Sequence, residues 1–491
     1  MQKKNNYLRE IISFILAVLV IGIAFWGLKQ FQQPQTSLDP KTQEPQTSGS
    51  NSSPTPPQSQ KKATTKSIQS RISRGEKILI DTEEINVRFS EFQDAKKRGV
   101  EAMAAGNYDE AVVHFERAIK RYPNAPETLI YLNNARIGNK KAYTIAVSIP
   151  ISSDVSGAQA ILRGVAQAQN EVNLGFGIGG VPLKVVIAND DDNPEIAKQI
   201  ASEFVSDSSI LGVIGHYSSG TTLAAGEVYN GGKLVSISPS STSIALSGKY
   251  DWVFRTVPSD AFGARALANY MLDVLRRKKA VIFYNPESAY SQSLKSEFVT
   301  AVSLGGGQVV DEISLSESNF SAFKSIKKAK ERGAEVLMLA PTPAFLDKAL
   351  QVVNVNDGEL DLLGGDAVYA LKTLELGGKD ARNLTVAVVW HIDGDPYSDF
   401  PRRSKQLWKA EVNWLSAMAY DAAQAFITAL DRSPTRPGIQ QTLLASDFSA
   451  FGASGEILFQ QTGDRNGSIQ LVKVAPGSKS GAGYDFVPIR W

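Results

Sequence analysis

The sequence predicts an α/β protein with two lobes built on parallel sheets, a small all-α helical module before them and an N-terminal transmembrane helix. Three observations lead to this fold class. Residues 143–491 alternate short apolar runs with amphipathic stretches, which is typical of parallel strands and of helices that cover both faces of their sheet. Residues 67–142 carry helical spacing. Residues 11–28 form an apolar run without a charge.

The apolar runs of the C-terminal region predict its strands. They are YTIAVSIP, LKVVIAND, ILGVIG, LVSIS, AVIFYN, EVLMLA, DLLGG and TVAVVW. So many parallel strands indicate two sheets, and hence two lobes within 143–491. We place lobe 1 at about 143–257 and 391–455, and lobe 2 at about 258–390 and 456–491. The final segment, GEILFQQTGDRNGSIQLVKV, predicts a hairpin pair around a Gly-Asp…Asn-Gly turn.

The N-terminal apolar run is close to the about 20 residues that a helix needs to cross a bilayer. Lys3, Lys4 and Arg9 precede it against one acid, Glu10. The positive-inside bias therefore places the tail, 1–10, in the cytoplasm and everything after the anchor, 11–29, outside. A cleaved signal peptide and a buried soluble helix are the alternatives, although no pair of small residues marks a cleavage site.

Two different segments separate this anchor from the α/β region. Residues 30–66 are rich in Gln, Pro, Ser, Thr and Lys, a composition that buries too little apolar surface to fold, so we expect a disordered tether. Residues 67–142 resemble a tetratricopeptide repeat. A protein-docking surface and a spacer or self-association surface both remain open for this module. The residues at the repeat's spacings are Gly99, Gly106, Tyr108, Ala111, Phe115, Ala118 and Pro123.

The composition excludes several classes of function. The 52 basic and 50 acidic residues give a net charge of +2, without the basic excess of a nucleic-acid binder. The chain has no cysteine, which excludes disulfides and thiolate chemistry. It has no G-x-S-x-G elbow and no histidines at metal-ligand spacing. The G-x-G-x-x-G at 175–180 lies between a helix and a strand, the reverse of a dinucleotide site. We therefore predict no enzyme, cofactor or metal.

Two loops rich in hydroxyl groups follow consecutive predicted strands. One is HYSSGTT at 216–222 and the other is PSSTS at 239–243. In open α/β sheets, ligands bind beyond the carboxyl ends of the strands. Hydroxyls and free N–H groups at a helix start favour an anion there. Plain helix capping is the alternative, but two such loops together favour a carboxylate site.

Six strings occur in a family-like order: VIGHYSSGTT, SISPSSTSIAL, VFRTVPSD, SAYSQS, LLGGDAVY and AMAYDAA. Through them, 143–491 resembles the leucine/isoleucine/valine-binding family, which has the type I periplasmic binding protein fold. The resemblance implies a solute-binding protein that closes its lobes on an amino acid or similar zwitterion, with an ABC-type permease as partner. With the anchor, it predicts a bacterial inner (cytoplasmic) membrane location with the bulk on the periplasmic side.

The resemblance also implies which residues bind the ligand. Ser219 matches the family's serine for the α-carboxylate, and Ser240 and Thr242 match the next loop, which binds carboxylate and ammonium. Tyr290 matches a tyrosine of the second lobe. Asp366 matches an acidic residue that pairs with the α-ammonium. A zwitterion would then be fully paired only when the lobes close.

Some positions depart from the family and leave other functions open. The segment 341–343 replaces an aromatic residue, small residues around 156–157 replace another, and Asp366 stands where glutamate is common. A branched aliphatic ligand is therefore not implied. A ligand sensor that signals in trans and an envelope scaffold that has lost ligand binding are the alternatives.

Overall fold

The computed structural model describes residues 68–81 and 90–489. The chain divides into two compact units, Met1–Gln58 and Ser59–Trp491, and all described residues belong to the second. The predicted tail, anchor and tether lie outside the described residues. Within the described ranges, no helix is both long enough and apolar enough to cross a membrane.

The first lobe contains a six-stranded sheet in the order β1-β3-β2-β4-β5-β6. Its strands are β1 (Ile72–Ser73), β2 (Tyr143–Ile149), β3 (Leu183–Asn189), β4 (Ile210–Ile214), β5 (Val235–Ser238) and β6 (Val253–Arg255). All pairings are parallel except that of β1 with β3. The order reverses between β2 and β4, and such a switch point is where open α/β sheets form ligand crevices.

Helices cover both faces of this sheet because successive strand residues point to opposite sides. Ile145 and Val147 of β2 share a core with α6 and α15, whereas Ala146 shares a core with α7 and α8. Gly164 permits the close crossing of α6 and α15, since a Cβ there would lie 2.2 Å from Ser416 O. The helices are α6 (Val155–Leu174), α7 (Pro194–Ser206), α8 (Ser219–Gly232), η2 (Ile244–Leu246), α14 (Phe400–Trp408), α15 (Trp414–Arg432) and α16 (Arg436–Leu443).

The second lobe contains a seven-stranded sheet in the order β15-β14-β11-β10-β9-β7-β8. Its strands are β7 (Lys279–Tyr284), β8 (Gln308–Ser314), β9 (Val336–Ala340), β10 (Asp361–Gly364), β11 (Thr385–Val388), β14 (Gln470–Pro476) and β15 (Tyr484–Pro488). The first five are parallel, and β14 and β15 extend the sheet antiparallel. The order reverses between β7 and β9, which gives this lobe its own switch point.

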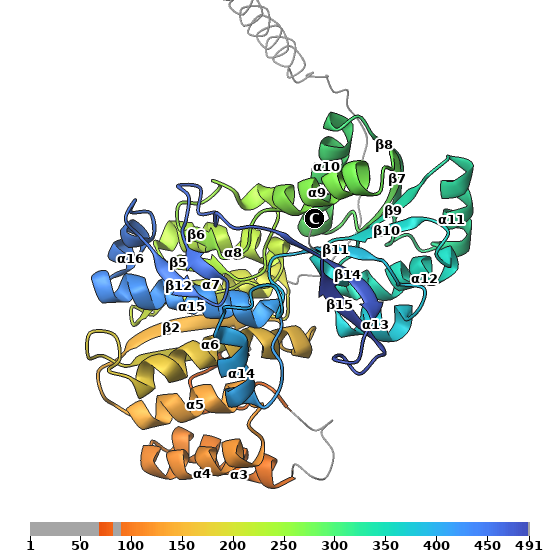
Figure 1. The fold of residues 1–491 in the computed structure, drawn as a ribbon. Helices are drawn as coiled ribbons and strands as arrows, with labels where there is room; N and C mark the ends of the chain where they lie inside the picture. Colours follow the sequence, from red (N-terminus) through yellow and green to blue (C-terminus); the bar gives the residue numbers. More distant parts are fainter. Residues whose placement is uncertain (1–67, 82–89, 490–491) are drawn as a thin grey trace, which may run out of the picture. The chain divides into compact units, whose positions relative to one another are not determined.

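One face of the second sheet is covered by α9 and α10, and the other by α11, α12 and α13. Figure 1 shows these two layers on either side of the strands. The helices are α9 (Asp260–Asn269), η3 (Tyr270–Val274), α10 (Ala289–Leu304), α11 (Ala322–Glu331), η4 (Pro343–Phe345), α12 (Leu346–Asn356), η5 (Asp366–Val368) and α13 (Leu371–Gly377).

The chain passes between the two sheets three times. The crossings are residues 256–259 after β6, 389–399 after β11 and 458–469 after β13 (Gly455–Ile457). Two of the predicted lobe boundaries fall within the first two crossings. The third falls inside β13, which pairs with β12 (Ala450–Gly452) and packs beside α15 in the first lobe.

The predicted helical module is continuous with the core of the first lobe. It contains α3 (Ser90–Ala104), α4 (Tyr108–Arg121) and α5 (Pro126–Ile137). Figure 1 shows α3 and α4 beyond α5. Leu129, Ile130 and Leu132 of α5 are buried in the same core as β2 and α6. Gly99 lets α3 approach α4, because a Cβ there would lie 2.5 Å from the Phe115 ring. The tetratricopeptide assignment stays a prediction.

The predicted hairpin pair in the final segment is wrong. Strand β13 pairs with β12, whereas β14 pairs with β11 and β15, so the two runs belong to different sheets. Between them, an isolated antiparallel bridge joins Phe459 to Arg465 around the Gly-Asp turn. Alternating apolar residues mark a strand, but they do not say which sheet the strand joins after the chain crosses between lobes.

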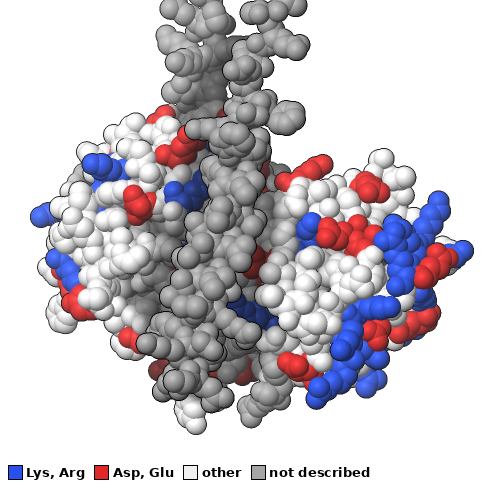
Figure 2. All heavy atoms as spheres, turned by 90° about the horizontal axis from the view of Figure 1, so that it is seen from above, with Lys and Arg blue, Asp and Glu red and all other residues white. Residues whose placement is uncertain are grey.

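Charges of both signs are mixed on the surface of the second lobe. Figure 2 shows Lys and Arg next to Asp and Glu on the side where Figure 1 places α11 and α12. Ion pairs there join Asp311 to Lys328 and Arg332, and Glu359 to Lys330. This mixing gives no single-signed field over these helices, which fits the small net charge.

Candidate functional site

The five predicted site residues lie in loops or at the starts of helices that follow parallel strands of both sheets. Ser219 follows β4, Ser240 and Thr242 follow β5, Tyr290 follows β7, and Asp366 follows β10. Helix α10 contacts both α8 and η2, which brings the two sets of loops together. We call this region the lobe interface. One direct link across it is the hydrogen bond from Ile244 N to Ser293 Oγ, at 3.0 Å.

The two hydroxyl-rich loops of the first lobe are tied to each other. Ser219 Oγ accepts from Ser243 N at 3.2 Å, and Ser240 Oγ donates to Tyr217 O at 2.7 Å. The N-cap of α8 is Ser218, whose side chain accepts from Thr221 N. Ser219 therefore keeps its O–H for a ligand, whereas the O–H of Ser240 is already used to hold the loops together.

A buried arginine stands behind the second loop. Arg255 is 2% exposed and donates to the carbonyl oxygens of Ser241 and Ser243, at 3.2 and 2.8 Å. Asp464 Oδ1 accepts from Arg255 Nε at 2.7 Å and balances part of its charge. The guanidinium fixes the loop's backbone and leaves some positive potential behind it, which favours an anion in front.

A second buried network holds the loop after β4. His216 Nδ1 lies 2.6 Å from Asp190 Oδ2, and His216 Nε2 lies 2.9 Å from the Tyr229 hydroxyl. Ser148 Oγ donates to the same carboxylate oxygen of Asp190 at 2.9 Å. All four side chains are fully buried. A substrate has no access to this His–Asp pair, so its role is to position the loop.

Thr242 and Asp260 bring two buried polar groups together next to the first crossing. They are 5% and 4% exposed, and Asp260 N donates to Thr242 O at 2.8 Å. Thr242 Oγ1 and Asp260 Oδ2 are buried and have no well-formed hydrogen bond within the described residues. The hydroxyls of Ser293 and Thr242 nevertheless lower the pKa of Asp260 through hydrogen bonding, so Thr242 and Asp260 are neighbours joined by a poorly aligned contact. A buried polar contact of poor geometry is weak, and a ligand that offers better partners to both groups can replace it.

On the second-lobe side, Tyr290 holds the segment that carries Asp366. The Tyr290 hydroxyl accepts from Ala367 N at 3.4 Å, and it packs so closely on Gly365 that a Cβ there would lie 2.6 Å from it. Asp366 is half-buried and begins η5. The glycine therefore lets the phenol reach the backbone and orient the carboxylate beside it.

The carboxylates at the lobe interface have raised pKa values. Burial raises the pKa of Asp260 to about 7, and the nearby charge of Asp366 adds to this shift, while Ser293, Thr242 and Arg255 oppose it. Burial also raises the pKa of Asp366 to about 6, against the opposing effect of Tyr290. Both shifts show an environment that disfavours unpaired negative charge, and a cationic ligand group would relieve it.

An aromatic side chain also reaches this region from the first lobe. Burial raises the pKa of Tyr217 well above its usual value, and Asp154, Asp192 and Asp366 raise it further. Tyr217 therefore lies close enough to both lobes for carboxylates of each to raise its pKa. The predicted loss of pocket aromatics at 156–157 and 341–343 is thus accompanied by an aromatic residue in the loop after β4.

The structure brings Thr242, Tyr290 and Asp366 near one another around Asp260. Ser219 and Ser240 lie in the adjoining loops. Sequence reasoning missed Asp260, although the quoted string VFRTVPSD ends on it. Its position at the start of α9 is also that of an acidic residue that complements a helix dipole, so only its burial distinguishes it. The described residues contain no group of His, Asp and Glu that could hold a metal ion.

Comparisons with known proteins agree with this architecture. The Periplasmic binding protein family model matches residues 142–481. The leucine-specific-binding protein of Salmonella typhimurium is 24% identical over 315 residues, which cover 62% of this chain and 83% of that protein. The Leu/Ile/Val-binding protein homolog 1 of Brucella suis is 30% identical over 257 residues, which cover 49% and 67%.

A solved structure gives the same result for the fold. The ABC transporter substrate-binding protein of Desulfitobacterium hafniense, in complex with Leu, superposes with a TM-score of 0.61 at 24% identity. The match covers 71% of this chain and 100% of that chain. The family match spans all three crossings and both sheets apart from their edge strands β1 and β15. This chain therefore belongs to the periplasmic binding protein family, a non-enzymatic class of solute-binding proteins.

Proposed function

We propose that this chain is a membrane-tethered, extracytoplasmic substrate-binding protein that captures an amino acid or a similar small zwitterion by closing its lobes. The ligand's carboxylate meets the hydroxyls of Ser219 and Thr242 and the N–H groups at the start of α8. Its ammonium meets Asp260 and Asp366, with Tyr290 orienting the latter. Ser240 acts through the hydrogen bond that ties the two loops.

One observation carries this proposal. Two buried groups of opposite character, Thr242 Oγ1 and Asp260 Oδ2, lie where the two lobes meet, with no well-formed hydrogen bond within the described residues. A zwitterion satisfies both at once, whereas a simple anion would face Asp260 and Asp366. Each charged hydrogen bond in such a place contributes about 1.5–3 kcal/mol. Since the partners come from both lobes, the ligand binds the closed state better and shifts the population towards it.

Delivery to an ABC-type permease is the second part of the proposal. It is supported by the similarity to a Leu/Ile/Val-binding protein homolog and to the solved structure of an ABC transporter substrate-binding protein in complex with Leu. The anchor at 11–29 and the tether at 30–66 would hold the lobes on the periplasmic side of the inner membrane. Recovery of a permease, and not of a receptor or kinase, on affinity purification of the full-length chain would support delivery over signalling in trans.

Calorimetry of the full-length chain against the proteinogenic amino acids tests ligand capture. At least one should bind with a Kd in the micromolar range or tighter, about −8 kcal/mol or better. Small-angle scattering should show the lobes moving closer on addition of that ligand. Benzoate, which has a carboxylate and no ammonium, is the control and should bind far more weakly. Failure of every amino acid to bind or to close the lobes would favour the scaffold alternative.

A further inference from the structure

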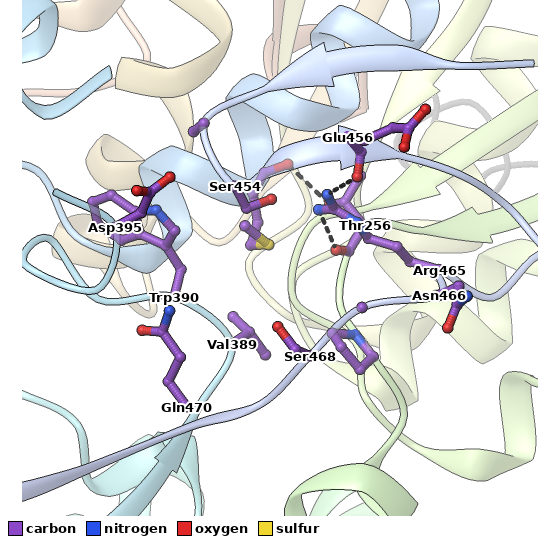
Figure 3. A pocket seen from close by; sticks show the side chains of 14 residues that line it. Thr256, Val389, Trp390, Asp395, Ser454, Glu456, Arg465, Asn466, Ser468 and Gln470 are labelled. Atoms are coloured by element: carbon purple, nitrogen blue, oxygen red, sulfur yellow. Dashed lines mark hydrogen bonds between the residues drawn. The ribbon is translucent and has the colours of Figure 1, made fainter. Parts of the chain in front are cut away.

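A cavity of about 240 Å³ lies where the three crossings between the lobes run together. Its lining includes Thr256 and Pro258 of the first crossing, Val389 and Trp390 of the second, and Asn466 of the third. Figure 3 shows these segments around one space. None of the five predicted site residues lines it. The cavity is therefore separate from the site proposed for the transported ligand.

The cavity has an unsatisfied hydrogen-bond donor on one side. Arg465 is 4% exposed; its two terminal nitrogens donate to Asp421 Oδ2 at 2.7 Å, to Thr256 O at 3.2 Å and to Glu456 O at 2.9 Å. Its Nε is buried and has no partner within the described residues. Asp421 pairs with one terminal nitrogen of the guanidinium, and the free Nε–H can donate one further hydrogen bond to an acceptor such as a carboxylate oxygen.

The opposite side offers an unsatisfied acceptor. Gln470 Oε1 is buried and likewise has no partner in the described part of the chain. Gly394 allows the amide its position, since a Cβ there would lie 2.3 Å from Gln470 Oε1. Asp395, an exposed residue, also lines the cavity and adds a carboxylate near its rim. Figure 3 shows Gln470, Trp390 and Asp395 on the left and Arg465 on the right.

Size and polarity together indicate a small zwitterion. The volume would hold about eight waters at about 30 Å³ each, and it lies just below the about 300–1,000 Å³ of pockets for drug-sized ligands. An acceptor group is needed at Arg465, and a donor at Gln470 with negative charge nearby. We propose that this cavity is a second ligand site, for a free amino acid or another small zwitterion, with its carboxylate at Arg465 and its ammonium at Gln470 and Asp395.

Occupancy of this site is coupled to lobe closure. Its walls come from all three crossings, and a hinge rotation of the lobes bends these segments. The cavity therefore changes shape between open and closed states, and a molecule that fits one state better shifts the balance towards it. By linkage, a ligand at the crossings changes the affinity of the lobe interface, and the reverse effect is equal in size.

The test uses the full-length chain with the lobe interface weakened by Ser219→Ala and Asp366→Asn together. Each proteinogenic amino acid is titrated to about 10 mM, ten times a Kd of about 1 mM. Residual binding at the weakened lobe interface should not respond to Gln470→Leu, whereas binding in the cavity should weaken at least about tenfold when Gln470→Leu is added. Asp395→Asn, at an exposed position, should weaken it a few-fold. Gln351→Leu, on the exposed face of α12, is the matched control and should leave it unchanged.

Several outcomes would overturn the proposal. If no amino acid binds, the cavity holds only solvent and the proposal is wrong. It is also wrong if Gln470→Leu and Asp395→Asn leave the binding unchanged. Equal binding of acetamide, which has an acceptor and a donor but no charge, would overturn the zwitterion class. Thermal unfolding of each variant shows whether Gln470→Leu has merely unfolded the protein, in which case Asp395→Asn decides. In the unmutated chain, this second ligand should change the affinity of the lobe interface at least about twofold, and no change would refute the coupling.

Discussion

The two sides of the lobe interface have opposite chemistry. The first-lobe side offers hydroxyl donors, Ser219 and Thr242, in loops that are tied together and backed by Arg255. The second-lobe side offers the carboxylate of Asp366, and Asp260 stands at the crossing between them. Neither side alone pairs both ends of a zwitterion. The comparison teaches that affinity must depend on bringing the sides together, and that each side recognises one end of the ligand.

The two sides also differ in how they are supported. The first-lobe loops are fixed by several hydrogen bonds, including those of Ser240 and Arg255 to backbone carbonyl oxygens. The segment that carries Asp366 is held by backbone hydrogen bonds, such as Gly365 N to Leu339 O at 3.0 Å, and by the phenol of Tyr290 at 3.4 Å. Removing a single hydroxyl from the first side leaves the other donors in place. Removing the charge of Asp366 leaves the ligand's ammonium with only a buried and partly protonated Asp260. The loss of affinity should therefore be larger for a change on the second-lobe side than for one on the first-lobe side.

The largest expected effect therefore comes from Asp366. Asp366→Asn keeps the size of the side chain and removes its charge, which leaves the ligand's ammonium incompletely paired in a buried place. We expect the Kd for the best-bound amino acid to rise about 100-fold, or about 2.7 kcal/mol. Calorimetry measures it, with Asp273→Asn at an exposed position of the same lobe as the control. A change below about threefold would remove Asp366 from the site.

A smaller effect should come from pH. An ammonium group favours the ionised forms of Asp260 and Asp366, whose pKa values without ligand are about 7 and 6. Binding should therefore release protons below pH 7, and affinity should fall at least about tenfold between pH 7.5 and pH 5.5. Calorimetry in two buffers of different ionisation enthalpy counts the protons. Proton uptake, or affinity that is constant over this range, would contradict the assignment.

In the ligand-free protein, Asp260 makes the folded state less stable as pH rises, whereas ligand affinity rises with pH. The pKa of Asp260 is raised in the folded state above its ordinary value of 3.8. The contribution of Asp260 to the free energy of unfolding is therefore fully present below about pH 4 and is lost as pH rises through about 7. Asp260→Asn should therefore stabilise the ligand-free protein at pH 8, by on the order of 2 kcal/mol, and weaken ligand binding. Asp251→Asn, at an exposed position, is the control, and thermal unfolding at pH 5 and pH 8 is the measurement.

The two regions also differ in how far the sequence could predict them. The buried parallel strands were predicted because each is a short apolar run that needs both faces covered. Strand β6 has only three residues, and β8 is half-buried at the sheet edge, so neither carries such a run. The hairpin prediction failed because β13 and β14 lie on opposite sides of a crossing, and periodicity says nothing about which sheet a strand joins.

The site was predicted only where it follows local rules. The hydroxyl clusters after β4 and β5 predicted a carboxylate site, and Asp366 came from the family resemblance. Asp260 could not be separated from an ordinary acidic residue in a first helical turn, since its significance rests on burial between lobes. The use of the Ser240 hydroxyl between the two loops was hidden for a similar reason. Its partner, Tyr217 O, lies in a loop that the sequence places 23 residues away.

The smallest effects sharpen the comparison within the first lobe. The O–H of Ser219 and that of Thr242 make no well-formed hydrogen bond within the described residues, so Ser219→Ala and Thr242→Val should each raise the Kd about fivefold, the value of one hydrogen bond of about 1 kcal/mol. Thr242→Ser, which keeps the hydroxyl, should restore most of the affinity. Ser240→Ala should instead lower the thermal unfolding temperature and change the Kd less than about twofold, because its O–H already binds Tyr217 O. Were Ser240→Ala to weaken binding more than Ser219→Ala at equal stability, Ser240 would contact the ligand directly and the division between binding and supporting hydroxyls would be wrong.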